Sequence, residues 1–127
     1  MPIEAKSPVI RPKQEVVLTK AVLRAADTLG VKARQLASVL GVSETTVSRM
    51  KKGGFLLEAD TKPFELGVLF VRLFRSLDAI MGGDEHSARA WLENPNLALG
   101  AQPAEKIRSI AGLVDVIAYL DARRAQI

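Results

Sequence analysis

The side chains best suited to binding a nucleic acid gather in one short segment of this chain. Residues 33–53 read ARQLASVLGVSETTVSRMKKG. Apolar residues recur at three- and four-residue spacing on either side of Gly41, which predicts two short helices with apolar inner faces. Glycine tolerates the positive φ of a tight corner, so Gly41 is the expected turn. The inner positions are Leu36, Ala37, Leu40, Val47 and Met50.

The polar residues of the same segment then lie on the outer faces. Arginine, serine, threonine and glutamate can hydrogen-bond base edges, while lysine supplies phosphate contacts. Ser43 suits the N-cap of the second helix, whose start would enter the major groove. The predicted DNA-binding residues are Lys32, Arg34, Gln35, Ser43, Glu44, Thr45, Ser48, Arg49, Lys51 and Lys52. The alternative is an α-hairpin whose polar face is simply solvated.

This pattern resembles the helix-turn-helix of bacterial Xre-like repressors, over about residues 32–53. The distribution of charge agrees with that resemblance. Residues 1–62 carry 11 basic and 6 acidic side chains, whereas residues 63–127 carry 7 and 8. A basic region attracts a polyanion. We therefore expect the first half to bind operator DNA and the second half to have a different role.

The elements that position these residues are all predicted to be helical. We expect a flexible arm at residues 1–14, and then helices at about 15–30, 33–40, 43–53, 63–81 and 84–94, with two more starting at Pro103 and after Gly112. Asp60 or Thr61 should cap the long helix, and Asp84 the next one. The chain lacks the alternation typical of strands, so the predicted fold class is all-α. A helix-turn-helix lobe at residues 15–62 would precede a C-terminal helical lobe at 63–127.

The helix predicted at residues 63–81 is apolar over more than half of its circumference. Its apolar residues cannot all face one neighbour, so it must be central or pack against a second copy of the chain. Together with the apolar stripe of residues 113–120, this favours a homodimer. Arg72, Arg75 and Asp78 interrupt the apolar run, which is too short and too charged to be a membrane span.

An angular segment interrupts the helical pattern at residues 88–103, which read ARAWLENPNLALGAQP. Asn94 precedes a proline, which disfavours helical backbone, so the helix that carries Trp91 must end there. We expect Asn94 to cap a short turn that Gly100 ends. The side chains expected to pack around this corner are Trp91, Leu97 and Leu99.

This corner and the residues after it resemble the toxin-binding domain of the Xre–MbcA–ParS antitoxin family, over about residues 65–127. The shared features are Trp91-Leu92, Pro95-Asn96, Leu99-Gly100, Pro103, Gly112 and an amphipathic final helix. The resemblance implies a partner toxin of the RES-domain family, whose members resemble ADP-ribosyltransferases and use NAD. It further implies that the antitoxin blocks the toxin's NAD pocket while its helix-turn-helix represses their own operon.

The resemblance also implies which residues would contact the toxin. They are predicted to be Trp91, Asn94, Asn96, Tyr119, Arg123, Arg124 and Ile127. Tyrosine, tryptophan and arginine are favoured anchors of protein interfaces. The alternatives are that Trp91 only fills the core, and that Arg123 and Arg124 only offset the helix dipole.

Residues for catalysis or metal binding are sparse in this chain. There is no cysteine, His86 is the single histidine, and no glycine-rich phosphate loop occurs, so we expect no enzyme, no metal and no cofactor. The first residues show no signal peptide, which favours the cytoplasm. The predicted function is an autorepressing antitoxin of a type II toxin–antitoxin system. The alternative is a plain dimeric helix-turn-helix transcriptional regulator with no toxin partner.

Overall fold

The computed structural model describes residues 10–126 of the chain. Seven helices lie within that range: α1 (Ile10–Leu29), α2 (Ala33–Leu40), α3 (Glu44–Lys51), α4 (Lys62–Ile80), α5 (Glu85–Glu93), α6 (Pro103–Lys106) and α7 (Ile110–Arg124). The β-pairing found among the described residues is limited to an isolated bridge between Asn96 and Ala101. The all-α prediction is therefore confirmed.

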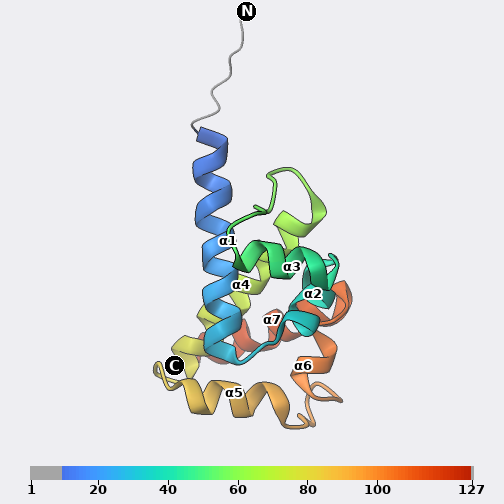
Figure 1. Cartoon of the computed structure of the whole chain (residues 1–127). Coiled ribbons are helices and arrows are strands. Elements are labelled where there is room, and N and C mark those ends of the chain that lie inside the picture. The colour runs from blue at the N-terminus through green and yellow to red at the C-terminus, as the bar shows by residue number, and fades with distance from the viewer. Residues whose placement is uncertain (1–9, 127) are drawn as a thin grey trace, which may run out of the picture.

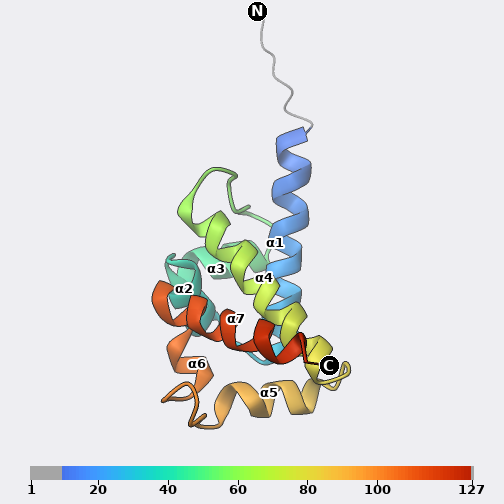
Figure 2. The same ribbon diagram turned by 180° about the vertical axis from the view of Figure 1, so that it is seen from behind.

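Helix α4 is the centre of the molecule. It contacts α1, α2, α5 and α7, and its side chains Phe70, Leu73 and Leu77 are fully buried. Figure 1 shows α2 and α3 on one side of α4, and Figure 2 shows α7 crossing α4 on the other side. The buried cluster runs from α2 and α3 through to α7, so both halves of the chain share one hydrophobic core. The outer face of α4 stays partly open, because Val68 is 46% exposed.

Side-chain caps determine where four of the helices begin. Ser43, Thr61, Asp84 and Ser109 each accept a hydrogen bond from a backbone N–H of the first turn that follows. The caps predicted at Ser43 and Asp84 are confirmed, and of the two candidates before α4 it is Thr61 that caps. Hydrogen bonds from the side chain and backbone of Ser87 hold the pKa of Asp84 below its usual range. These caps fix the entry points of α3, α4, α5 and α7.

Two predicted helix boundaries are wrong. Helix α1 begins at Ile10, so residues 10–14 are helical and not part of a flexible arm. A proline such as Pro12 is compatible with a first turn, where the backbone nitrogen has no helical acceptor. The rest of the predicted arm, residues 1–9, lies outside the described residues.

The second wrong boundary is at the last helix. Helix α7 begins at Ile110, and Gly112 lies in its first turn instead of preceding it. A Cβ at Gly112 would overlap the backbone carbonyl oxygen of Lys106. Glycine is therefore needed here because α6 and α7 approach closely, and not because the helix must break.

No helix in the described range has the length and apolar character needed to cross a membrane. No three histidine or acidic side chains of residues 10–126 come together in a group that could hold a metal ion.

Candidate functional site

Helices α2 and α3 meet at a tight corner built around Gly41. Gly41 has a φ of 72°, and its N–H donates to the carbonyl oxygen of Ala37. Val47 and Met50 of α3 are buried against the core. The hydroxyl of Ser43 accepts the N–H of Thr46 at 3.0 Å, which leaves the first turn of α3 facing outward. The predicted helix-turn-helix geometry is therefore present.

The predicted DNA-binding residues lie around this corner and along α3. Nine of them are exposed and Ser48 is half-buried; the exposed ones are Lys32, Arg34, Gln35, Ser43, Glu44, Thr45, Arg49, Lys51 and Lys52. Gln35 has a structural task as well, since its side-chain oxygen accepts the backbone N–H of Lys32 at 2.9 Å and caps α2. The basic side chains thus lie at the start of α2 and at the C-terminal end of α3.

Arg49 is more constrained than its sequence position indicates. Its guanidinium lies 5.4 Å from the centre of the Phe55 ring and donates to the carbonyl oxygen of Gly54 at 3.4 Å. A cation held over an aromatic face is pre-oriented before any ligand arrives. Phe55 was not among the predicted site residues. The sequence signal that could have identified it is an isolated aromatic residue directly after Gly53-Gly54.

The angular segment forms a closed turn between α5 and α6. Helix α5 ends at Glu93, and Asn94 has the extended backbone expected before a proline. The cap of the turn is Asn96, whose side-chain oxygen accepts the N–H of Leu99 at 3.1 Å. The backbone of Asn96 also pairs with Ala101. The expectation that Asn94 caps this turn is therefore wrong, because the turn starts two residues later.

Packing at this corner differs from the expectation as well. Leu99 is half-buried and packs against the core, but Leu97 is fully exposed at 100%. Leu97 follows the bridged residue Asn96, and its side chain does not pack at this corner. The side chain of Gln102 closes the corner by donating to the carbonyl oxygen of Glu93 at 2.7 Å. The corner is held mainly by hydrogen bonds, with Leu99 as its inward-packing leucine.

Three of the predicted toxin-binding residues come together on the surface, and we call Trp91, Tyr119 and Arg123 the aromatic cluster. The rings of Trp91 and Tyr119 are stacked with centroids 6.1 Å apart and an angle of 22°. The guanidinium of Arg123 donates to the Tyr119 hydroxyl at 2.9 Å and lies 5.8 Å from the centre of its ring. Both aromatic side chains are half-buried and Arg123 is exposed. The cluster joins α5 to the outer part of α7.

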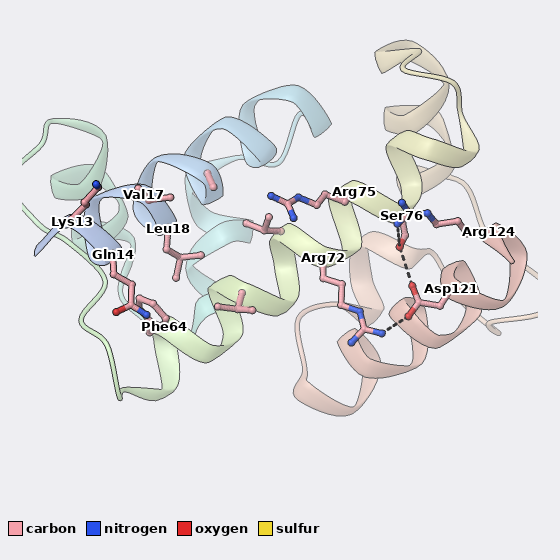
Figure 3. A pocket seen from close by; sticks show the side chains of 13 residues that line it. Lys13, Gln14, Val17, Leu18, Phe64, Arg72, Arg75, Ser76, Asp121 and Arg124 are labelled. Carbon is pink, nitrogen blue, oxygen red and sulfur yellow. Dashed lines mark hydrogen bonds and ion pairs between the residues drawn. The ribbon is translucent and has the colours of Figure 1, made fainter. Parts of the chain in front are cut away.

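Arg124 belongs to a different contact. Its guanidinium donates to the hydroxyl of Ser76 on α4 at 3.3 Å. Ser76 is buried and donates to Asp121 at 2.9 Å, and the second oxygen of Asp121 accepts a 2.5 Å bond from Arg72. Figure 3 shows these side chains where α4 meets the last turns of α7. We call Arg72, Ser76, Asp121 and Arg124 the polar clamp. Asn94 and Asn96 lie at the corner, and Ile127 lies outside the described residues.

Comparison with known proteins identifies two family models that match successive parts of the chain. The family model of the antitoxin Xre-like helix-turn-helix domain matches residues 9–72, and that of the antitoxin Xre/MbcA/ParS C-terminal toxin-binding domain matches residues 76–125. A chain in the crystal structure of the M. tuberculosis MbcT-MbcA toxin-antitoxin complex has a similar fold, with a TM-score of 0.65 and 20% identity. That similarity covers 87% of this chain and 96% of the other. No curated protein matches the sequence.

Proposed function

Because the chain belongs to the family of antitoxins that join an Xre-like helix-turn-helix to an Xre/MbcA/ParS toxin-binding domain, we propose that it neutralises a RES-domain toxin. Its C-terminal part, from residue 63, covers the toxin's NAD pocket. Its helix-turn-helix represses the operon that encodes both proteins. In this proposal the chain acts in the cytoplasm as a homodimer and has no catalytic activity of its own.

The observation that carries the toxin-binding proposal is the aromatic cluster. Its three residues lie within the region that matches the toxin-binding domain, and they are of the types that dominate binding energy in protein interfaces. Stacking of Trp91 on Tyr119 and the bond from Arg123 to the Tyr119 hydroxyl hold the side chains in one arrangement. Little side-chain entropy is then lost when a partner binds.

The operator-binding proposal rests on the exposed polar side chains of α3 and its neighbours. Thr45 and Arg49 are exposed on α3, while Lys51 and Lys52 lie at its C-terminal end. Arginine prefers the guanine edge in the major groove, and lysine contacts phosphates. Glu44, at the start of α3, would read a cytosine amino group if it reaches the bases. These roles make affinity strongly dependent on salt.

Co-expression tests the toxin-binding proposal against the plain regulator. The chain is tagged and produced together with the RES-domain protein encoded beside it, and complexes are purified and analysed by size. We expect a stable complex and restored growth of cells that make the toxin. The matched control is Thr45→Ala with Arg49→Ala, which should lose promoter binding and keep the complex. If the wild-type chain binds its promoter but never co-purifies with the toxin, it is a plain regulator.

A further inference from the structure

Phe55 follows the helix-turn-helix directly, in the segment that joins α3 to α4. Its side chain is half-buried, and the centre of its ring lies 5.4 Å from the guanidinium carbon of Arg49. Arg49 itself is exposed on α3, among the residues predicted to bind DNA. The contact therefore joins a side chain of the predicted DNA-binding surface to an aromatic residue that lies outside the two helices of the motif.

The turn that ends α3 determines where Phe55 lies relative to Arg49. The N–H of Gly53 donates to the carbonyl oxygen of Met50 at 3.1 Å, and the N–H of Gly54 donates to the carbonyl oxygen of Arg49 at 2.9 Å. These two bonds form the Schellman pattern of a closed helix end, in which Gly53 has a φ of 81°. The backbone therefore turns back on the last turn of α3, and the residue that follows this turn, Phe55, lies beside the side chain of Arg49.

The segment after Phe55 is fastened to α1. The N–H of Leu57 donates to the hydroxyl of Thr19 at 2.9 Å, and both residues are buried. The N–H of Ala59 donates to the carboxylate of Glu15 at 2.9 Å. Figure 1 shows this segment passing from the end of α3 beside α1. Phe55 is therefore held between a closed helix end and a loop that is bonded to the core, so its ring can restrain another side chain.

We propose that Phe55 is a positioning residue for the reading of DNA sequence, because it holds the guanidinium of Arg49 ready for the edge of one guanine in the major groove. This deepens the operator-binding part of the proposed function and rests on it. Arginine has many side-chain conformations, and their loss on binding weakens a complex. The ring contact and the 3.4 Å hydrogen bond to the carbonyl oxygen of Gly54 restrict the side chain of Arg49 before DNA arrives. Less entropy is then lost when Arg49 meets a base.

The same contacts leave the guanidinium of Arg49 able to bind a base. A cation over an aromatic face is attracted by the quadrupole of the ring, so this contact uses no N–H donor. The bond to the carbonyl oxygen of Gly54 uses one terminal nitrogen, and the guanidinium fork has further N–H donors. The guanine edge presents the acceptors N7 and O6, which match that fork. A restrained Arg49 can therefore still make a bidentate contact.

Binding of the full-length chain to two DNA duplexes tests the proposal. One duplex carries the promoter of the operon that encodes the chain, the other has an unrelated sequence of equal length, and fluorescence anisotropy measures both affinities. Phe55→Leu should lower affinity for the promoter by about 2- to 10-fold, the cost of immobilising one side chain with many rotamers. Affinity for unrelated DNA and the salt dependence should not change, because phosphate contacts are kept. Phe55→Tyr keeps an aromatic face and should retain promoter affinity.

A double-mutant cycle shows whether Phe55 acts through Arg49. In the Arg49→Ala background, Phe55→Leu should cause no additional loss of promoter affinity, because the side chain that it positions is already missing. The matched control is Leu56→Ala. Leu56 is the next residue of the chain and is also half-buried, but it has no ring, so this variant should keep the preference for the promoter. Thermal unfolding followed by circular dichroism reports whether each variant keeps the fold.

The inference is overturned if Phe55→Leu leaves promoter affinity unchanged, or lowers affinity for both duplexes equally. It is also overturned if the loss is as large in the Arg49→Ala background, or if Phe55→Leu raises promoter affinity, since the ring would then hold Arg49 away from DNA. These results leave the proposed function standing as long as the wild-type chain prefers its promoter. A wild-type chain that binds both duplexes equally would instead refute the operator-binding proposal, and the inference with it.

Discussion

Arg123 and Arg124 are adjacent and chemically identical, yet they lie on different flanks of α7. Consecutive residues of a helix project about 100° apart. Arg123 leans over Tyr119, beside Trp91, and remains on the surface. Arg124 reaches back to Ser76 on α4. One helix therefore exposes a side chain on one flank and uses the other flank to fasten itself to the core of its own chain.

The two flanks also differ in how their polar groups are satisfied. In the polar clamp, the buried hydroxyl of Ser76 bonds both Asp121 and Arg124. In the aromatic cluster, the Tyr119 hydroxyl accepts its hydrogen bond from the exposed guanidinium of Arg123. The clamp joins α7 to α4, while the cluster leaves parts of two aromatic rings exposed to solvent. This difference can be tested by substitutions on each flank.

The largest effect is expected from removing the aromatic cluster. Tyr119→Ala with Arg123→Ala should lower affinity for the toxin by about 100-fold or more, since two hot-spot side chains are lost. Isothermal titration of the purified proteins measures this. Point substitutions are preferable to truncation, because cutting at Tyr119 would also remove buried Leu120. Arg124→Ala is the matched control and should bind the toxin nearly normally; equal losses would erase the distinction between the flanks.

The helix-turn-helix forms a third surface. Substitutions there should change affinity for the promoter without changing affinity for the toxin. Arg49→Ala should weaken binding to the promoter by about 1–3 kcal/mol if the side chain makes a bidentate base contact. Its packing on Phe55 supports such a contact by fixing the side chain in advance. Fluorescence anisotropy with promoter DNA measures the loss, and toxin affinity should not change. Unchanged operator affinity would show that the reading face lies elsewhere on the motif.

Stability should depend on Arg124 more than on Arg123, whereas toxin affinity should depend on Arg123 more than on Arg124. Arg124→Ala removes a hydrogen bond to a buried hydroxyl and should lower the free energy of unfolding by about 1 kcal/mol. Arg123→Ala removes an exposed contact and should change it by less than about 0.5 kcal/mol. Urea denaturation followed by circular dichroism compares the two variants. Equal stabilities would mean that the polar clamp does not fasten α7 to α4.

The smallest effect is expected at a single phosphate contact. Lys51→Ala should reduce the slope of log affinity against log salt by about 1, with a uniform loss across DNA sequences. Binding to promoter and unrelated DNA at several salt concentrations measures this slope. A loss confined to the promoter sequence would instead make Lys51 a base-reading residue.

Much of the fold follows from local sequence signals, because they are properties of a few neighbouring residues. The caps at Ser43 and Asp84 and the corner at Gly41 depend on side-chain oxygen chemistry and on glycine's φ, both visible in the sequence. The inward faces of α2, α3 and α7 follow from apolar spacing. Pattern alone therefore predicted the helices and most of the core.

What could not be predicted depends on how segments are arranged in space, whether they are distant in sequence or only a few residues apart. Periodicity places Arg124 on a flank of α7, but it does not reveal that Ser76, 48 positions earlier, lies opposite. The need for glycine at position 112 comes from the backbone of Lys106, which only the packed structure brings close. The outward direction of Leu97 depends on the bridge that closes its turn. The three-dimensional arrangement of the backbone determines all three features.

Inhibition of the toxin is the most direct test of the account. NAD consumption by the purified RES-domain toxin is followed while the chain is added to saturation. We predict that wild-type chain and Arg124→Ala reduce consumption to background, whereas Tyr119→Ala with Arg123→Ala requires a far higher concentration. Full consumption of NAD in the presence of saturating wild-type chain would contradict the account and leave only a DNA-binding regulator.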